Sequence, residues 1–188
     1  TQLDSRFDGM TIKTAPRKID MIMSEEQIQS KLNDLATKLK PRLEGEWTAI
    51  AILLGAMPFA VDLMKALARL DTHPVLDAIW LESYHDSRES SGRVGIKADI
   101  SREIKGRGVL LLDDVFDTGR TLDFAKKHML AKGAREVVSC AMAVKPVERA
   151  SSMQLDYYAF EAPSRFLVGY GMDDAGLYRG VPFIGALD

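Results

Sequence analysis

The sequence predicts an α/β protein with a doubly wound, mostly parallel sheet. Short continuous apolar runs at residues 49–54, 109–112 and 137–144 are typical of strands that are buried on both faces. Segments with apolar residues at helical spacing alternate with these runs, an order typical of a parallel sheet covered by helices. No internal repeat, low-complexity tract or linker divides the 188 residues, so we expect a single domain over 1–188.

The first expected helix begins after Ser24. Residues 1–20 mix charged and scattered apolar residues, and we expect an extended arm there. Ser24 to Gln27 reads Ser-Glu-Glu-Gln, which matches a capping box that satisfies free backbone amides. Apolar residues then recur at helical spacing until Pro41 ends the helix; they are Ile28, Leu32, Leu35 and Leu39.

A strand, a helix and a second strand are expected next. The run 49–54 lies between Gly45 and Gly55, and Pro58 can occupy the first turn of the following helix. That helix is expected to fade near Leu70. Its inner face is expected to hold Val61, Met64, Leu67 and Ala68. Residues 74–81 are typical of the second strand.

Polar residues dominate 83–92, where we expect a mobile loop or a long hairpin connection. Beyond it, the strand at 109–112 leads into an acidic turn at 113–119 and a helix at about 121–132. Gly133 ends that helix, and the strand at 137–144 follows. The closely spaced Gly and Pro residues after it predict short strands joined by turns, which form a lobe attached to the sheet.

The composition excludes several classes of protein. With 25 basic and 27 acidic residues the net charge is −2, which argues against an extended nucleic-acid surface but allows a local phosphate pocket. The single Cys140 excludes a disulfide framework within the chain, and we expect it to be buried and inert. No apolar run approaches the roughly 18 residues of a membrane span, and the polar N-terminus lacks a secretory signal, so a cytosolic protein without membrane contact is expected.

The stretch 109–122 holds the residues from which chemistry is expected. In open α/β sheets, ligands bind beyond the carboxyl ends of the strands. Gly119 lets the backbone approach a ligand, and Thr118 and Thr121 add hydroxyl groups. The start of the following helix adds free N–H groups and a positive dipole end, so this half of the stretch predicts a monophosphate site.

The other half of the stretch is acidic. Asp113 and Asp114 are neighbours, and two buried carboxylates are costly unless a cation or hydroxyl groups compensate their charge. A sugar diol with Mg²⁺ supplies both, so the whole stretch describes a site for a ribose 5-phosphate. The alternative is an acidic loop in which Asp117 or Thr118 only caps the helix, which would explain one residue of the stretch but not the rest.

The stretch 109–122 resembles the phosphoribosyl-diphosphate (PRPP) signature of type I phosphoribosyltransferases. The resemblance extends from about Met23 to Leu187, and it is specifically to the hypoxanthine-guanine phosphoribosyltransferases. Further stretches that carry it are Leu53-Leu54-Gly55-Ala56, Ser83-Tyr84, Val144-Lys145-Pro146, and 165–173 continuing to Tyr178-Arg179.

The resemblance implies a fold and an activity. The fold would be that of type I phosphoribosyltransferases, with a small hood formed by the N-terminus and largely by residues 145–188. The activity would be transfer of the 5-phosphoribosyl group from PRPP to N9 of hypoxanthine or guanine, giving IMP or GMP and pyrophosphate in purine salvage. The family also implies a homodimer or homotetramer.

The resemblance also implies a role for each residue of the acidic stretch. Asp113 and Asp114 would hold the ribose hydroxyls and Mg²⁺, and Asp113 stands where the family often has Glu. Successive strand side chains point to opposite faces, so both can reach the ligand only if the strand has already ended. Asp117 would be the general base at N7 of the purine. The 5′-phosphate would be held by Thr118, Gly119, Arg120 and Thr121.

Pyrophosphate would meet the backbone of Leu54 and Gly55 and the side chain of Arg179. Many relatives carry Lys or Arg where this chain has Leu54, so a side-chain phosphate contact is missing there. The family's cis peptide in this loop could survive the change, because only backbone N–H groups are needed. The alternative for Leu54 is an ordinary turn at a strand end.

The purine would be bound by residues near the C-terminus. Lys145 would donate to O6 and select 6-oxopurines, Phe166 would stack on the base, and Leu167 would contact its edge through the backbone. Asp173 would be a second Mg²⁺ ligand, with Asp174 a solvated neighbour. Without the family, Lys145 would be assigned to the surface and Phe166 to the core.

A lid is expected over the site, because PRPP would be hydrolysed if water entered. The polar loop 83–92 would form it, with Ser83 and Tyr84 at its base; His85 stands where the family usually has Gly. His73 and His128 lack the spacing of metal ligands.

Three rival functions remain. A xanthine-preferring transferase would share almost every residue of the site. An RNA-binding regulator on the same fold typically has Tyr at the position of Asp117 and should be basic, and this chain has neither feature. A PRPP-making synthetase would not need Lys145 or the stretch 166–173.

Overall fold

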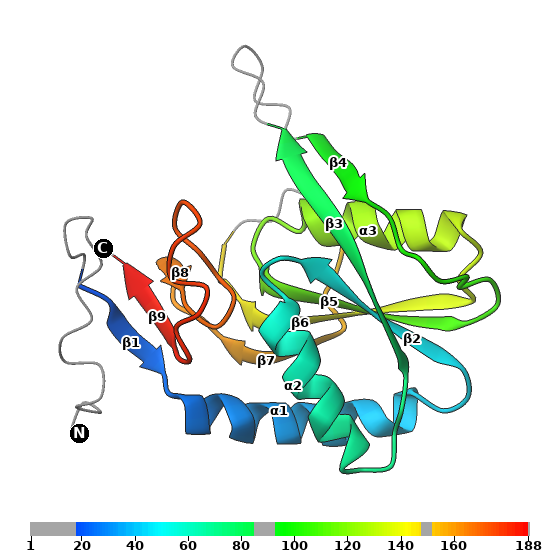
Figure 1. Ribbon diagram of the computed structural model, residues 1–188, viewed down its shortest axis with the longest axis horizontal. Helices are drawn as coiled ribbons and strands as arrows, with labels where there is room; N and C mark the ends of the chain where they lie inside the picture. The colour runs from blue at the N-terminus through cyan, green and yellow to red at the C-terminus, as the bar shows by residue number, and fades with distance from the viewer. Residues whose placement is uncertain (1–17, 85–92, 148–151, 188) are drawn as a thin grey trace.

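The computed structural model describes residues 18–84, 93–147 and 152–187, so most of the expected N-terminal arm lies outside it. A six-stranded sheet in the order β4-β3-β2-β5-β6-β7 forms the centre (Figure 1). Its strands are β2 (Trp47–Leu53), β3 (Val75–Tyr84), β4 (Arg93–Ala98), β5 (Gly108–Phe116), β6 (Glu136–Val144) and β7 (Tyr157–Glu161). All neighbours pair in parallel except β3 and β4, which confirms the predicted mostly parallel sheet.

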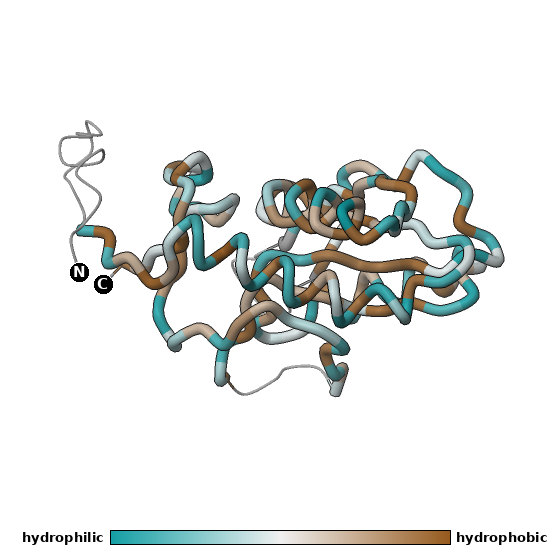
Figure 2. Tube along the Cα trace, turned by 90° about the horizontal axis from the view of Figure 1, so that it is seen from below, coloured by the Kyte–Doolittle hydropathy of each residue, from teal (hydrophilic) through white to brown (hydrophobic). Residues whose placement is uncertain are grey.

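Helices cover both faces of this sheet. On one face, α1 (Glu25–Leu39) and α2 (Met57–Ala68) pack on Ala49, Ala51 and Leu110. On the other, α3 (Arg120–Ala131) packs on Ile50, Ile52 and Leu111. Because neighbouring residues of a buried strand point to opposite faces, one apolar run supplies both layers. Figure 2 shows the result as mostly brown strands between helices of mixed colour.

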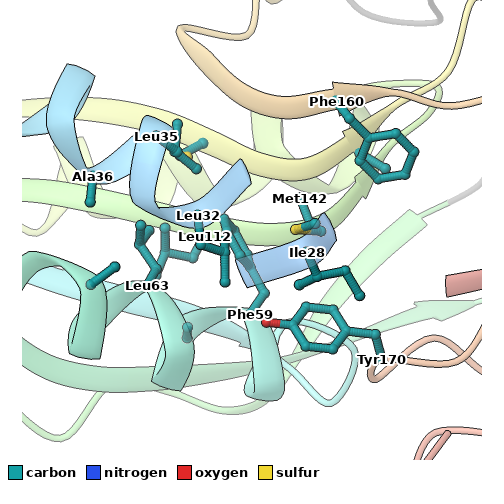
Figure 3. Close-up of a cluster of buried hydrophobic side chains, with 14 of the residues drawn as sticks. Ile28, Leu32, Leu35, Ala36, Phe59, Leu63, Leu112, Met142, Phe160 and Tyr170 are labelled. Carbon is teal, nitrogen blue, oxygen red and sulfur yellow. The ribbon is translucent and has the colours of Figure 1, made fainter. Parts of the chain in front are cut away.

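The first helix forms as predicted. The Ser24 hydroxyl accepts the amide of Gln27 at 3.3 Å, and the Gln27 side chain accepts the amide of Ser24 at 2.9 Å, which completes the capping box. Pro41 lies in the 3₁₀ turn η2 (Lys40–Arg42) that follows α1. The buried residues of α1 are Ile28, Leu32, Leu35, Ala36 and Leu39, and several of them appear in Figure 3.

The inner face predicted for α2 is only half correct. Leu67 is fully buried and half-buried Met64 packs against the core, as predicted. Val61 and Ala68 are exposed instead, whereas Phe59 and Leu63 are fully buried. The helix is apolar on two sides, so two stripes compete for the core. The stripe that contains Phe59 faces the core, because the large Phe59 ring fills the space between α1 and the sheet (Figure 3).

A second, three-stranded antiparallel sheet in the order β1-β9-β8 forms what we call the hood. It contains β1 (Asp20–Met23), β8 (Phe166–Val168) and β9 (Ile184–Leu187), so it joins segments from the two ends of the sequence (Figure 1). An ion pair of 2.9 Å between Arg165 and Asp20 links the same two segments. The short C-terminal strands were predicted, but only β8 and β9 lie in a lobe beside the main sheet, whereas β7 joins the edge of that sheet next to β6.

Two strands run further than predicted. β5 continues through both acidic residues to Phe116, so the turn begins only at Asp117. β3 extends to Tyr84 and pairs antiparallel with β4, which makes the polar segment a hairpin connection. The expected lid residues 85–92, including His85, lie outside the described residues.

Packing at the opposite, amino-terminal end of the strands depends on a glycine. The ring of buried Trp47 lies over Gly108, so a Cβ on Gly108 would come within 2.5 Å of a ring atom. The Arg42 and Arg135 guanidinium groups lie 5.9 Å and 5.8 Å from the same ring centre. Within the part of the chain that the structure describes, no helix is long and apolar enough to span a membrane.

Candidate active site

The acidic pair lies where β5 loses one of its neighbours. β2 pairs with β5 only as far as Leu112, whereas β6 stays paired with β5 to Phe116. Residues 113–116 therefore have one free strand edge. There the amide of Asp114 donates to Asp113 Oδ1 at 3.0 Å, and the amide of Val115 donates to Asp114 Oδ1 at 2.7 Å. β5 therefore continues past the pair, contrary to the expected strand end, and these local bonds hold each carboxyl group beside the amide of the residue that follows it.

Burial raises the pKa of Asp113 well above its usual range, and the charge of the neighbouring Asp114 raises it further. A hydrogen bond joins the two carboxyl groups. Burial also raises the pKa of Asp114. The amide of Val115, the hydrogen bond from Asp113 and the positive charge of Arg179 lower this pKa but do not cancel the effect of burial. The pair therefore lacks enough positive charge within the protein to keep both carboxyl groups ionised.

The loop after β2 lies against this pair. A Cβ on Gly55 would come within 1.8 Å of Asp114 Oδ2, so only glycine permits this approach. The Leu53–Leu54 peptide bond is cis, which is the conformation that the resemblance implies for this loop. Leu54 is partly exposed, and its carbonyl accepts the amide of Met57 at 3.2 Å as α2 begins.

Asp117 and Lys145 meet at the carboxyl ends of neighbouring strands. The amide of Lys145 donates to the carbonyl of Phe116 at 3.1 Å, which extends the pairing of β5 and β6. Their side chains form an ion pair of 3.4 Å, in which Lys145 is mostly buried and Asp117 is half-exposed. The surface alternative for Lys145 is therefore wrong.

The turn into α3 is made by a glycine. Gly119 has φ +83° and is the residue directly before the helix, so the capping position carries no side chain. The first bond of the helix runs from the amide of Asp123 to the carbonyl of Gly119 at 2.9 Å, so the earlier amides have no acceptor within the helix. Thr118 and Arg120 are exposed beside them and Thr121 is half-buried.

Phe166 extends from the hood. It is 52% exposed at the start of β8, so the alternative that it belongs to the core is wrong. Leu167 beside it is buried, and its backbone pairs with Ala186 of β9. The structure therefore offers an exposed aromatic face on a strand held firmly in its sheet.

Arg179 and Asp173 hold each other in the loop after β8. Arg179 donates to the carbonyl of Gly171 at 2.6 Å and pairs with Asp173 Oδ1 at 2.6 Å, while the amide of Gly176 donates to Asp173 Oδ2 at 2.6 Å. Both oxygens of Asp173 thus have partners in their own loop. In residues 18–84, 93–147 and 152–187, no three His, Cys, Asp or Glu side chains gather as a metal cluster, so Asp173 does not join the acidic pair.

The remaining sequence candidates contribute less. Ser83 and Tyr84 end β3, and the residues expected to form a lid after them lie outside the described part of the chain. Burial raises the pKa of the Cys140 thiol, which fits an inert core residue. His73 and His128 pair with Asp71 and Asp99 rather than with each other. Sequence reasoning missed the turn at 169–171, although two glycines flanking one tyrosine were a visible signal of unusual backbone.

The chain matches the family described as phosphoribosyl transferase domain over residues 18–175. It is 35% identical to the hypoxanthine-guanine phosphoribosyltransferase of Bacillus subtilis (strain 168) over 168 residues, 89% of this chain and 92% of the relative. A crystal structure of a hypoxanthine-guanine phosphoribosyltransferase from Bacillus anthracis has a TM-score of 0.84 at 34% identity, over 92% of this chain and 100% of the other. For a hypoxanthine phosphoribosyltransferase from Staphylococcus aureus the TM-score is 0.83 at 31% identity, over 90% and 91% of the chains. The fold, the acidic strand end and these likenesses together mean that the chain belongs to the phosphoribosyltransferase family, among its hypoxanthine-guanine members.

Proposed function

We propose that this protein transfers the 5-phosphoribosyl group from PRPP to N9 of hypoxanthine or guanine, forming IMP or GMP and releasing pyrophosphate. One observation carries the proposal: an acidic pair, a glycine loop and an uncapped helix start meet at one edge of the sheet, where β2 no longer pairs with β5. Those are the groups needed for a diol, a pyrophosphate and a monophosphate, the three polar parts of PRPP.

The 5′-phosphate is bound by the turn into α3. Amides without helical acceptors and the positive end of the helix dipole attract an anion there. The hydroxyl groups of Thr118 and Thr121 and the exposed Arg120 add further donors. Gly119 keeps the turn tight enough for its backbone to contact the phosphate oxygens.

The ribose hydroxyls and Mg²⁺ are bound by Asp113 and Asp114. The fit rests on the chemistry of the pair: two buried carboxyl groups with raised pKa values need a cation or hydroxyl donors to ionise together. One or two carboxylates completed by substrate oxygens and water are a common Mg²⁺ environment. Asp173 would have to leave Arg179 to bind a second ion. Mg²⁺ held by this pair together with PRPP would supply positive charge against the departing pyrophosphate.

The leaving pyrophosphate contacts the Gly55 loop and Arg179. Leu54 brings no charge to that loop, so Arg179 is the cation that acts there through its side chain. Its present bond to the carbonyl of Gly171 and its pairing with Asp173 hold it near the acidic pair, where its positive charge lowers the pKa of Asp114. Opposing the charge that develops on pyrophosphate lowers the barrier to breaking the C1–oxygen bond.

Asp117 and Lys145 recognise the purine. N7 and O6 lie on one edge of a 6-oxopurine, the first as a donor when protonated and the second as an acceptor. An acceptor and a donor 3.4 Å apart match that edge, with Asp117 taking the N7 proton and Lys145 donating to O6. Adenine would place its 6-amino donor against the Lys145 ammonium, so it is rejected.

The hood completes the base site. Phe166 stacks on the purine, and Leu167 contacts its edge through the backbone. Residues 145–188 then serve largely as the base side of a single domain. With one buried cysteine and no disulfide, we place the enzyme in the reducing cytoplasm.

The test is pyrophosphate release by the purified protein with Mg²⁺ and PRPP. Hypoxanthine and guanine should be converted and adenine should not. Faster turnover of xanthine than of either would favour the xanthine-preferring alternative. Absence of turnover with every 6-oxopurine would refute the proposal. The rival function of an RNA-binding regulator would then be the next one to test.

We also propose that the protein is a homodimer or homotetramer through the outer side of α2. Met57 and Val61 are exposed along the helix, and Leu54 is exposed in the loop before it. Leu76 and Trp80 are exposed on the face of β3 that lies on the same side of the sheet. A helix that is apolar on both sides is typical of one buried in an assembly. Sedimentation velocity should show an oligomer for the unmodified chain and a monomer for Val61→Arg. A monomeric unmodified chain would contradict this.

A further inference from the structure

Tyr170 connects the hood to both helices on one face of the sheet. Its hydroxyl donates to Asp62 Oδ2 at 2.9 Å, with the carbonyl of Pro58 at 3.5 Å. Asp62 also accepts from Gln29 of α1 at 3.3 Å and from Lys65 at 3.0 Å. Figure 3 shows the Tyr170 ring beside Ile28, with its hydroxyl toward Phe59. This nearly buried side chain therefore joins the loop after β8 to α1 and α2.

The backbone at this point does not favour tyrosine. Gly169, Tyr170 and Gly171 have φ values of +85°, +50° and +97°, three successive residues in the left-handed region. Glycine adopts that region readily, whereas a residue with a bulky side chain seldom does. A tyrosine in this unfavourable conformation indicates that its side chain has a specific role, and the role visible here is the hydrogen bond to Asp62.

The same turn holds the pyrophosphate side of the site. The carbonyl of Gly171 accepts Arg179 Nη1 at 2.6 Å, and the amide of Gly171 donates to the carbonyl of Arg179 at 3.0 Å. A Cβ on Gly171 would come within 2.1 Å of the carbonyl oxygen of Gly55. A shift of this turn would therefore move Arg179 and open its contact with the Gly55 loop together.

We propose that Tyr170 and Asp62 form a positioning pair, whose hydrogen bond fixes the turn 169–171 against the Gly55 loop and so aims Arg179 at the pyrophosphate of PRPP. The pair touches no reactant, and its effect on catalysis rests on the proposed function. It acts on the binding of one substrate and leaves the purine site, formed by Lys145 and Phe166, unchanged.

The kinetic test uses Tyr170→Phe, which removes only the hydroxyl. The KM for PRPP should rise about 3- to 10-fold, the effect of losing one hydrogen bond, with a smaller fall in kcat because Arg179 also opposes the charge of the departing pyrophosphate, while the KM for hypoxanthine stays nearly constant. Tyr158→Phe is the matched control, because the Tyr158 hydroxyl bonds Glu161 at 3.1 Å on the exposed surface of β7. An unchanged KM for PRPP would refute the positioning role of Tyr170 and Asp62. A decrease in kcat alone would also refute it, because partial unfolding produces that result.

Variants of Asp62 distinguish the loss of its hydrogen bond with Tyr170 from a general loss of packing. Asp62→Asn keeps an oxygen that can accept from Tyr170 and should retain most of the PRPP affinity. Asp62→Leu should reproduce the rise in KM seen with Tyr170→Phe, and combining the two changes should add little, because both remove the same bond. Fully additive effects would contradict the proposal.

A measurement without turnover tests the pair even if the proposed reaction fails. In the ligand-free protein, the amides of Tyr170 and Gly171 donate to Val181 and Arg179 at 2.7 Å and 3.0 Å. Hydrogen exchange at these amides should accelerate in Tyr170→Phe and not in Tyr158→Phe. Unchanged exchange would overturn the positioning role. An unmodified chain that transfers nothing but shows the exchange difference would refute only the proposed function.

Discussion

Replacing Asp113 by asparagine should make the ligand-free protein more stable at neutral pH. Asparagine keeps the oxygen that accepts the Asp114 amide at 3.0 Å, and its amide group can donate to the Asp114 carboxylate as a protonated Asp113 does. It therefore preserves the local bonds and removes an ionisable group. The prediction follows from the raised pKa of Asp113, which burial causes first and the charge of Asp114 second.

The sign follows from proton linkage. Above the ordinary pKa of 3.8, the unfolded chain has released the Asp113 proton, while the folded protein keeps it up to its higher folded-state pKa. The contribution of Asp113 to the free energy of unfolding is therefore fully present below pH 3.8. It falls as pH rises, by at most about 1.4 kcal/mol per pH unit. From pH 5 to pH 7 the unmodified chain should lose up to about 2.7 kcal/mol that Asp113→Asn does not lose.

Urea unfolding followed by circular dichroism at pH 5, 6 and 7, with EDTA present, measures this difference. The difference in the free energy of unfolding between Asp113→Asn and the unmodified protein should widen with pH, by up to about 2.7 kcal/mol from pH 5 to pH 7. Asp34→Asn on the exposed side of α1 is the control. A gap that stays constant or narrows as pH rises would refute the reasoning. The more stable variant should also bind PRPP poorly, a common conflict between stability and function.

Three further substitutions have defined outcomes. Asp117→Asn should lower kcat by roughly 10²–10⁴ in steady-state assays, as expected on losing a general base, and an unchanged kcat would remove that role. Gly55→Ala would place a Cβ within 1.8 Å of Asp114 Oδ2, so kcat/KM for PRPP should fall by about 10²-fold, as displaced groups near a reaction do. Gly108→Ala would press a Cβ within 2.5 Å of the Trp47 ring and should cost about 1–3 kcal/mol of stability in urea unfolding without changing kcat per folded molecule.

The sequence predicted the positions of strands and helices best where a single local rule determines the structure. Continuous apolar runs identified β2, β5 and β6, and the capping box at Ser24 identified the start of α1 to the residue. In α2 two apolar stripes share one helix, and only the packing of Phe59 against α1 decides between them. Such a choice depends on residues far apart in sequence, so periodicity alone could not make it.

The candidate site divides in the same way. The positions of Asp117 and Lys145 follow from two strand ends at one edge of a parallel sheet, a rule that is visible in the sequence. The end of β5 was misjudged, because Asp113 and Asp114 bond their own backbone instead of turning the chain. The link from Tyr170 to Asp62 spans distant segments and depends on side-chain reach, which no local pattern encodes.

The order of strands in the hood affects how the protein is made on the ribosome. β9 lies between β1 and β8, and it is the last strand of the described chain to emerge during synthesis. The acidic pair and the turn into α3 have been translated once β6 is made, whereas Arg179 and the last hood strand follow later. Until Ile184 to Leu187 arrives, β1 and β8 have no common partner, so the hood cannot form before the end of the described chain has been made.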